Sequence, residues 1–143
     1  MDVYLTNEFI KETLTLLKSN SHKDIEQLLI QELFCKKSED IKGYRLSGDN
    51  TNSRFLKVRV SRENEGKSGG YRVYAWIIIK EDNLYLTYIH PKKGRRSQAS
   101  ISNDRIKELI KSFITERREN NFIKVENKDD IIINSQTQNP IFA

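Results

Sequence analysis

Positively charged side chains are concentrated in the middle of the chain, between positions 54 and 96. This segment has 11 lysines and arginines against 4 acidic residues, whereas residues 1–53 have 7 against 9 and residues 97–143 have 7 of each. The net charge of +5 therefore arises in the middle segment. A concentrated basic segment is typical of proteins that bind a polyanion, and the alternative is a solvated lysine-rich surface.

Two predicted strands in this segment alternate basic and aliphatic side chains. They cover residues 55–62 and 71–80. In the first strand Lys57 and Arg59 lie on one face and leucine and valine on the other. In the second, Arg72 and Tyr74 lie on one face and valine, alanine and isoleucine on the other. If the aliphatic sides of both strands meet the helices, these four side chains share the exposed face. A guanidinium binds phosphate through two hydrogen bonds and stays charged, so Arg59 and Arg72 suit a site that neutralises phosphate.

Further basic residues flank these strands. A glycine-rich turn at 66–70 contains Lys67 and precedes the second strand. A third strand, predicted over 84–90, ends at Pro91, which has no N–H to donate to a ladder. The basic residues that follow are Lys92, Lys93, Arg95 and Arg96. We expect these four to hold nucleic-acid phosphates, with a solvated turn as the alternative.

The N-terminal third has a strand-then-helices pattern. A short edge strand is predicted at 2–5, and helices at 7–19 and about 25–35 would form an antiparallel hairpin. Thr6 is the predicted cap of the first helix, and Ser21 to Asp24 has the form of a capping box for the second. A further short strand is predicted at 42–46.

A third helix is predicted after the basic segment. Ser102 is its expected cap, and apolar residues repeat at helical spacing to about Glu119. We therefore expect one α+β domain over 1–119, with an antiparallel sheet of four to five strands packed on one side by two N-terminal helices and one C-terminal helix. Residues 120–143 are expected to be a tail that is poorly ordered or docked on a partner.

Composition excludes several classes of protein. No apolar run is long enough to span a membrane, and the first residues lack the pattern of a secretion signal. Cys35, the single cysteine, permits no internal disulfide, which indicates a reducing cytoplasm, and we expect it to be a small buried hydrophobe. Two histidines argue against a zinc site.

Three segments in order carry a resemblance to a known family. FLKVRV (55–60), GKSGGYRV (66–73) and LYLTYIHPKK (84–93) resemble consecutive strand signatures of the RelE/HigB-like bacterial toxins, within the RelE/ParE superfamily. The order of a strand, two helices and a meander of strands is also similar to that family.

The resemblance implies a toxin of a type II toxin–antitoxin system that cleaves mRNA in the ribosome and has a compact microbial RNase fold. It also implies a neutralising antitoxin, expected to be a small helix-turn-helix DNA-binding protein, and ribosome and mRNA as the other partners. The family's basic strand pair matches Lys57 and Arg59, and the residues around its double glycine match Lys67 and Arg72. Lys92 matches the lysine after the strand-ending proline.

Metal-free RNA cleavage sets the expected roles. The 2′-hydroxyl must lose a proton, the scissile phosphate must be neutralised and the 5′-oxygen must gain a proton. Arg59 and Arg72 would stabilise the charge on the phosphoryl oxygens, and Lys57 or Lys67 would transfer a proton if neighbouring cations favour its neutral amine. His90 is a candidate acid or base, and the alternative is a strand-end histidine bonded to the backbone. No metal or cofactor is expected.

Aromatic residues are candidates for stacking on RNA bases. Tyr74 and Tyr88 are assigned this role, whereas Trp76 is expected to pack in the core because a large aromatic residue in mid-strand is usually buried. Two rival functions stay open. One is a ParE-like toxin that inhibits DNA gyrase, and the other is a non-catalytic module that binds RNA or an antitoxin with the same fold.

Overall fold

The computed structural model describes residues 1–62, 70–92 and 101–142, which form seven strands and three α-helices. The strands are β1 (Asp2–Leu5), β2 (Tyr44–Ser47), β3 (Ser53–Val60), β4 (Tyr71–Ile78), β5 (Asn83–Pro91), β6 (Ile123–Lys128) and β7 (Ile131–Asn134). The α-helices are α1 (Asn7–Leu17), α2 (Ile25–Leu29) and α3 (Asn103–Glu119). Shorter helical segments are η1 (Asn20–His22), the π-helical η2 (Ile30–Phe34) and η3 (Ser38–Asp40). The α+β class is therefore as predicted.

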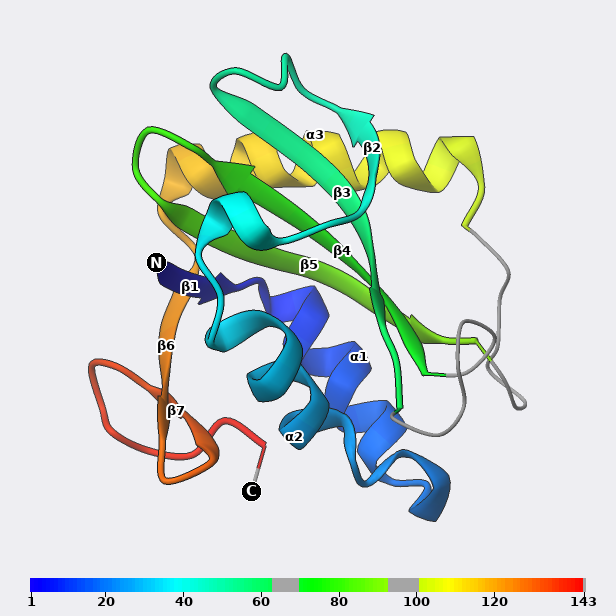
Figure 1. Ribbon diagram of the computed structural model, residues 1–143, viewed down its shortest axis with the longest axis vertical. Coiled ribbons are helices and arrows are strands. Elements are labelled where there is room, and N and C mark those ends of the chain that lie inside the picture. The colour runs from blue at the N-terminus through cyan, green and yellow to red at the C-terminus, as the bar shows by residue number, and fades with distance from the viewer. Residues whose placement is uncertain (63–69, 93–100, 143) are drawn as a thin grey trace.

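All strands belong to one sheet with the order β2-β3-β4-β5-β1-β6-β7 (Figure 1). The prediction of four to five antiparallel strands is wrong in two respects. The sheet has seven strands, and β1 lies inside it, parallel to β5 and antiparallel to β6. Parallel pairing is accessible here because the whole segment between β1 and β5 serves as the crossover. The expected edge strand is thus an internal strand.

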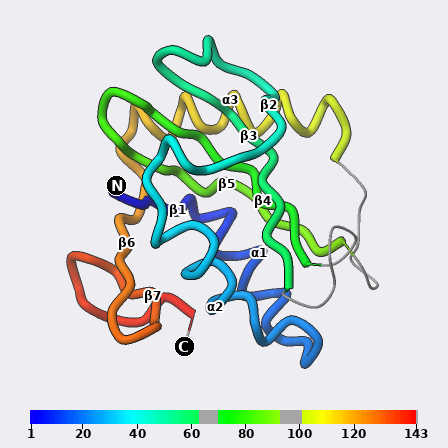
Figure 2. Tube along the Cα trace, in the orientation of Figure 1, coloured from blue at the N-terminus to red at the C-terminus, as the bar shows by residue number. Residues whose placement is uncertain are grey.

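The C-terminal segment, expected to be poorly ordered or docked on a partner, forms two of these strands in the structure. Asn120 has a left-handed conformation with φ 56°, which ends α3 and turns the chain back toward β1. β7 then lies beside α2, where the backbone N–H of Ile132 donates to Glu26 Oε2 at 3.0 Å. The orange-to-red part of Figure 2 follows this return. Residues 123–134 are therefore part of the same domain as 1–119.

Helices cover both faces of the sheet, whereas packing on one face was predicted. The α1 and α2 face has an aliphatic core that includes Leu56, Val58 and Val73. On the opposite face, Phe113 of α3 stacks on Trp76 with ring centroids 4.9 Å apart. Trp76 is 7% exposed, so its predicted core position is confirmed. This second core combines aromatic side chains with Ile101 and Leu109, and α3 crosses only part of the face (Figure 1).

Local signals predicted α1 and α3 well. Thr6 Oγ1 accepts from the Phe9 N–H, and Ser102 Oγ accepts from the Arg105 N–H, so both predicted caps are present. The capping box expected at Ser21 to Asp24 is absent, because Ser21 lies within η1 and Asp24 itself precedes α2, with a carboxylate that binds another side chain, described below. Cys35 is exposed rather than buried. Within the described ranges, none of the helices has the length and apolar character needed to cross a membrane.

Candidate functional site

Two rows of side chains cross β3, β4 and β5 on the face that α3 partly covers. In the first row Arg59 is paired with Arg72, which is paired with His90. In the second row Lys57 is paired with Tyr74, which is paired with Tyr88. Residues opposite each other in a ladder point to the same side of a sheet. The predicted common face of Lys57, Arg59, Arg72 and Tyr74 is therefore confirmed by the register.

A bulge in β5 brings its last side chains to this face. The register with β4 shifts between Tyr74 and Ala75, and Thr87 is the extra residue, with its hydroxyl donating to Tyr74 O at 2.7 Å. Strict alternation along β5 would place Leu86 and Tyr88 on one side of the sheet. The bulge separates them, with Leu86 in the aliphatic core and Tyr88 beside the aromatic one, because an inserted residue reverses the alternation.

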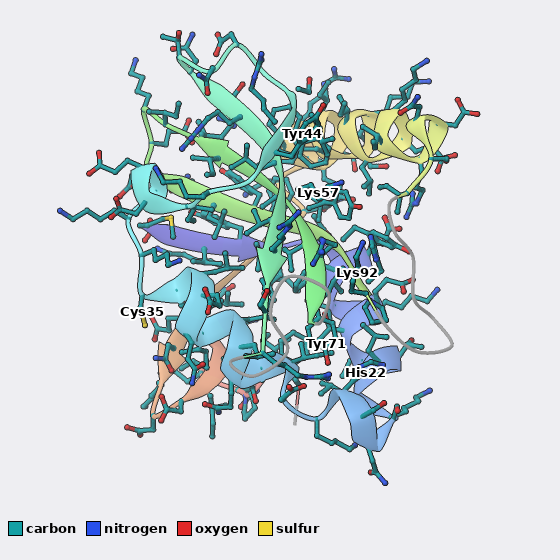
Figure 3. The ribbon with its side chains drawn as sticks, turned by 45° about the vertical axis from the view of Figure 1, so that its right-hand side comes forward. His22, Cys35, Tyr44, Lys57, Tyr71 and Lys92 are labelled. Atoms are coloured by element: carbon teal, nitrogen blue, oxygen red, sulfur yellow. The ribbon has the colours of Figure 1, made fainter. Side chains whose placement is uncertain are left out.

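Burial divides the six side chains into accessible and covered groups. Arg59 is exposed and Lys57 and Tyr88 are half-buried, whereas Arg72, Tyr74 and His90 are at most 3% exposed. Tyr74 was predicted to stack on RNA bases, but its ring is fully buried and offers no face to a base. Of the cations among these six side chains, Lys57 and Arg59 are therefore the two that solvent reaches, and Figure 3 shows Lys57 on β3.

His90 is a buried neutral imidazole. Its Nδ1 lies 3.2 Å from Pro91 O, and because a carbonyl only accepts, Nδ1 carries the hydrogen. The Nε2 atom then accepts from the Tyr74 hydroxyl at 2.9 Å. Burial lowers the pKa of His90, and the positive charges of Arg72, Lys92 and Lys57 lower it further, against a raising effect of the Pro91 carbonyl. The structure therefore has the alternative arrangement, a buried strand-end histidine bonded to the backbone and to Tyr74.

The positive charges in this site repel one another. Burial lowers the pKa of Arg72, and the charge of Arg59 opposite it lowers that pKa further. In the described part of the chain, Lys57, Arg59 and Lys92 form no ion pair with an acidic side chain. Three cations that form no ion pair within the described ranges favour a bound anion, because their mutual repulsion destabilises the unliganded site.

The remaining predicted residues divide between the rim of the site and undescribed segments. Lys92 is half-buried at the end of β5, where its N–H donates to Gly70 O at 2.9 Å. The guanidinium of Arg105 lies 5.0 Å from the centroid of the Tyr88 ring. The predicted residues outside the described part of the chain are Lys67, Lys93, Arg95 and Arg96.

One exposed aromatic residue was missed by the sequence analysis. Tyr44 is 69% exposed and is paired with Lys57 in the β2–β3 ladder, so it extends the second row to the outer strand. The Lys57 Nζ atom lies 5.7 Å from the centroid of the Tyr44 ring. A tyrosine between Gly43 and Arg45, in a predicted short polar strand, was the available signal.

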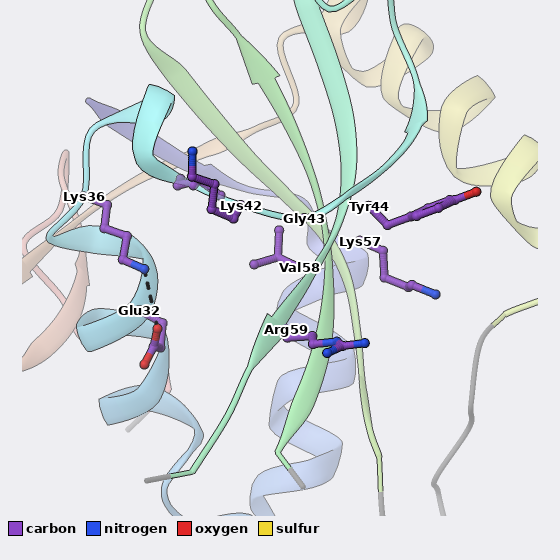
Figure 4. Close-up of a pocket in the computed structure, with 9 residues that line it drawn as sticks. Glu32, Lys36, Lys42, Gly43, Tyr44, Lys57, Val58 and Arg59 are labelled. Atoms are coloured by element: carbon purple, nitrogen blue, oxygen red, sulfur yellow. Dashed lines mark ion pairs between the residues drawn. The ribbon is translucent and has the colours of Figure 1, made fainter. Parts of the chain in front are cut away.

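Below Tyr44 the surface is hollowed beside the edge of β3. The hollow has a volume of about 470 Å³ and lies between η2, the segment before β2 and the strand β3. It is lined by Glu32, Lys36, Ile41, Lys42, Gly43, Tyr44, Lys57, Val58 and Arg59. Figure 4 shows that Tyr44, Lys57 and Arg59 extend to one side of β3, and that Glu32 and Lys36 lie on the other. The hollow, which has Ile41 and Val58 of the aliphatic core in its lining, therefore lies on the side of β3 away from the Lys57 and Arg59 side chains.

Among the described residues, no three histidine, cysteine or acidic side chains are grouped closely enough to hold a metal ion. Comparison with known protein families finds no match, and comparison with curated proteins finds no similar sequence.

Proposed function

We propose that this protein is an endoribonuclease toxin of a bacterial type II toxin–antitoxin system, and that it cleaves mRNA bound to the ribosome. The observation that carries the proposal is the pairing of Arg59 with Arg72 beside Lys57, on a sheet face that keeps two of these cations accessible. The resemblance of the strand segments to RelE/HigB-like toxins supports the same function, and so does the arrangement of two N-terminal helices and a strand meander.

The accessible cations suit the phosphoryl chemistry of RNA cleavage. Attack of the 2′-oxygen on phosphorus adds negative charge to the phosphoryl oxygens before the bond to the 5′-oxygen breaks. Arg59 donates hydrogen bonds to those oxygens from an exposed guanidinium, and Lys57 lies two residues away on the same face. Their charges are already in position, so little reorganisation is needed when the transition state forms.

The buried members of the rows support the accessible ones. Arg72 adds positive potential beneath Arg59, because the two residues are directly paired across β3 and β4. The Tyr74–His90 hydrogen bond joins β4 to β5 and so holds the floor of the site in one conformation. Lys57 is an accessible amine on this face that could transfer a proton, and Lys67 is the further candidate for this role.

An antitoxin is the expected protein partner, together with the ribosome and its mRNA in the cytoplasm. The cluster formed by Lys57, Arg59 and Lys92 has no acidic partner among the described side chains. An antitoxin segment with acidic side chains would neutralise it and would block RNA at the same time.

The test is translation of a defined mRNA in a purified bacterial system, followed by primer extension. The wild-type protein is compared with the double variant Lys57→Gln/Arg59→Gln and with Lys107→Gln/Lys111→Gln, which removes two exposed charges from α3 instead. We expect new mRNA ends with the wild type and the α3 variant, none with the site variant, and none on naked mRNA.

Intact mRNA in the presence of the wild-type protein would contradict the proposal. Supercoiling by DNA gyrase is then measured with the same three proteins. Inhibition that requires Lys57 and Arg59 would assign the site to the ParE-like class. Normal translation and normal supercoiling would leave a binding module without catalysis.

A further inference from the structure

We propose that Tyr44 is a stacking platform for an RNA base, and that this base belongs to the nucleotide next to the phosphate bound by Lys57 and Arg59. This inference rests on the proposed function in taking RNA as the polyanion at the site. It adds a residue and a subsite outside the segments that resemble the toxin family, whose first segment begins at Phe55.

The position of Tyr44 continues the site outward. The second row across the sheet reads Tyr44, Lys57, Tyr74 and Tyr88, each residue paired with the next in the ladder. Tyr44 is the outermost member because β2 is the edge strand. A base on its ring would therefore lie directly beside the Lys57 ammonium.

Packing does not account for an aromatic residue at this position. The Tyr44 ring is 69% exposed, the largest exposed fraction among the exposed large hydrophobic side chains of the described residues. Its described ring contact is the Lys57 ammonium, 5.7 Å from the ring centroid. A side chain this exposed gains little from burial in the folded state, whereas stacking on a base would bury one of its faces.

The start of β2 fixes Tyr44 at the last pair of the β2–β3 ladder. The backbone at Gly43 lies so close to β3 that an added Cβ would meet Lys57 O at 2.7 Å. β2 begins at the next residue, so the β2–β3 ladder stops at Tyr44 and Lys57. The hollow of about 470 Å³ has Ile41 and Val58 of the aliphatic core in its lining, so it lies on the other side of β3 from the Tyr44 ring and is not part of the proposed platform.

Charge favours nucleic acid over an acidic protein segment as the occupant. The Lys57 ammonium lies beside the Tyr44 ring and Arg59 extends to the same side of β3, and within the described residues neither forms an ion pair with a carboxylate (Figure 4). An aromatic ring beside cations is the usual arrangement for single strands, in which the ring binds a base and the cations bind the backbone. An acidic peptide would use the cations but would not require the exposed ring.

The test is binding of fluorescein-labelled single-stranded oligoribonucleotides at low salt, measured by anisotropy. Tyr44→Phe keeps the aromatic ring, and Tyr44→Leu keeps an apolar side chain without one. Ile131→Ala is the control, because Ile131 is 42% exposed on the other edge strand, β7. We expect Tyr44→Phe and Ile131→Ala to bind within about twofold of wild type, and Tyr44→Leu to bind roughly 5- to 150-fold more weakly.

Abasic substitution in the RNA identifies the stacked base. One abasic position should weaken binding by the wild-type protein and leave binding by Tyr44→Leu unchanged, since the contact is already lost in the variant. Equal affinity of Tyr44→Leu and wild type, a loss with Tyr44→Phe as large as that with Tyr44→Leu, or no RNA binding by wild type would each overturn the inference.

Cleavage on ribosomes, run on the same variants, separates this inference from the proposed function. Tyr44-dependent RNA binding without any cleavage by wild type would retain the subsite and refute the endoribonuclease. Cleavage by wild type with unchanged half-saturation in Tyr44→Leu would retain the endoribonuclease and refute the subsite.

Discussion

Replacing Arg59 by glutamine should stabilise the fold while it weakens RNA cleavage. Arg59 and Arg72 are directly paired across β3 and β4, and the charge of Arg59 lowers the pKa of Arg72. Like charges opposite each other in a ladder destabilise a sheet. Glutamine has nearly the length of arginine but no charge, so Arg59→Gln removes the repulsion and also removes a phosphate ligand.

The expected magnitudes follow from the position of the pair. A cross-strand pair contributes roughly 0.2–1 kcal/mol, and the lower half of that range applies because Arg59 is exposed and solvent screens its charge. The free energy of unfolding should therefore rise by about 0.2–0.5 kcal/mol, which raises Tm by roughly 1–2 °C. Loss of one ligand of the transition-state charge should lower the single-turnover rate of cleavage about 100-fold.

Thermal denaturation is measured in low salt and in about 0.5 M salt, where interactions between exposed charges are screened. The stabilisation should be present in low salt and absent in high salt, and Arg59→Lys, which keeps the charge, should show none. A lower Tm for Arg59→Gln in low salt would refute the argument that this pair is strained by repulsion. A stabilised variant with unchanged cleavage would refute the role of Arg59 in the site.

Three further predictions concern stability. His90 has a lowered pKa in the folded state, so the unfolded state takes up a proton first as pH falls, and the free energy of unfolding should decrease below about pH 6.5 by at most about 1.4 kcal/mol per pH unit. Urea unfolding between pH 7.5 and 5.5 should show a shallower decrease of this free energy for His90→Gln than for the wild type, and an equal decrease in both proteins would contradict the prediction. Ile132 is fully buried whereas Ile131 is 42% exposed, so Ile132→Ala should lower the free energy of unfolding by roughly 2–5 kcal/mol and Ile131→Ala by less than about 0.5 kcal/mol. If the two variants unfold at similar urea midpoints, the packing of β7 does not contribute to stability. Arg62 donates to Asp24 Oδ2 at 2.6 Å and to the buried Tyr71 hydroxyl at 2.8 Å, so Arg62→Ala should lower the free energy of unfolding by roughly 1–3 kcal/mol. Arg62→Lys should be destabilised as well, because lysine lacks the planar guanidinium, and a lysine variant as stable as wild type would mean that the charge alone matters.

The Arg62 contacts show how a local signal fails when a distant partner competes. Ser21 to Asp24 has the sequence of a capping box, and sequence alone predicted that the acid would close it. In the fold, Arg62 at the end of β3 reaches Asp24 and also the Ser21 carbonyl. The Asp24 carboxylate therefore forms a bidentate ion pair with Arg62 instead of a cap, and the residues around Asp24 do not predict a partner 38 positions away.

The sequence by itself determined the features that depend on neighbours within a few residues. The caps at Thr6 and Ser102 were correct because a hydroxyl bonds an N–H three residues on. The alternation of Lys57 and Arg59 with aliphatic residues was correct because side chains of a strand alternate between its faces. These features depend on neighbouring residues alone, so the packing of distant elements does not change them.

Only the tertiary structure decided which of the aligned side chains stay accessible. Arg72, Tyr74 and Tyr88 share a face with Lys57, but their burial depends on α3 and on the neighbouring strands, which come from distant parts of the chain. The bulge at Thr87 likewise arises from pairing with β4 and reverses the side to which the end of β5 points. Residue type and spacing specify a face of the sheet, whereas the packing of remote elements on that face determines how much of it can meet a ligand.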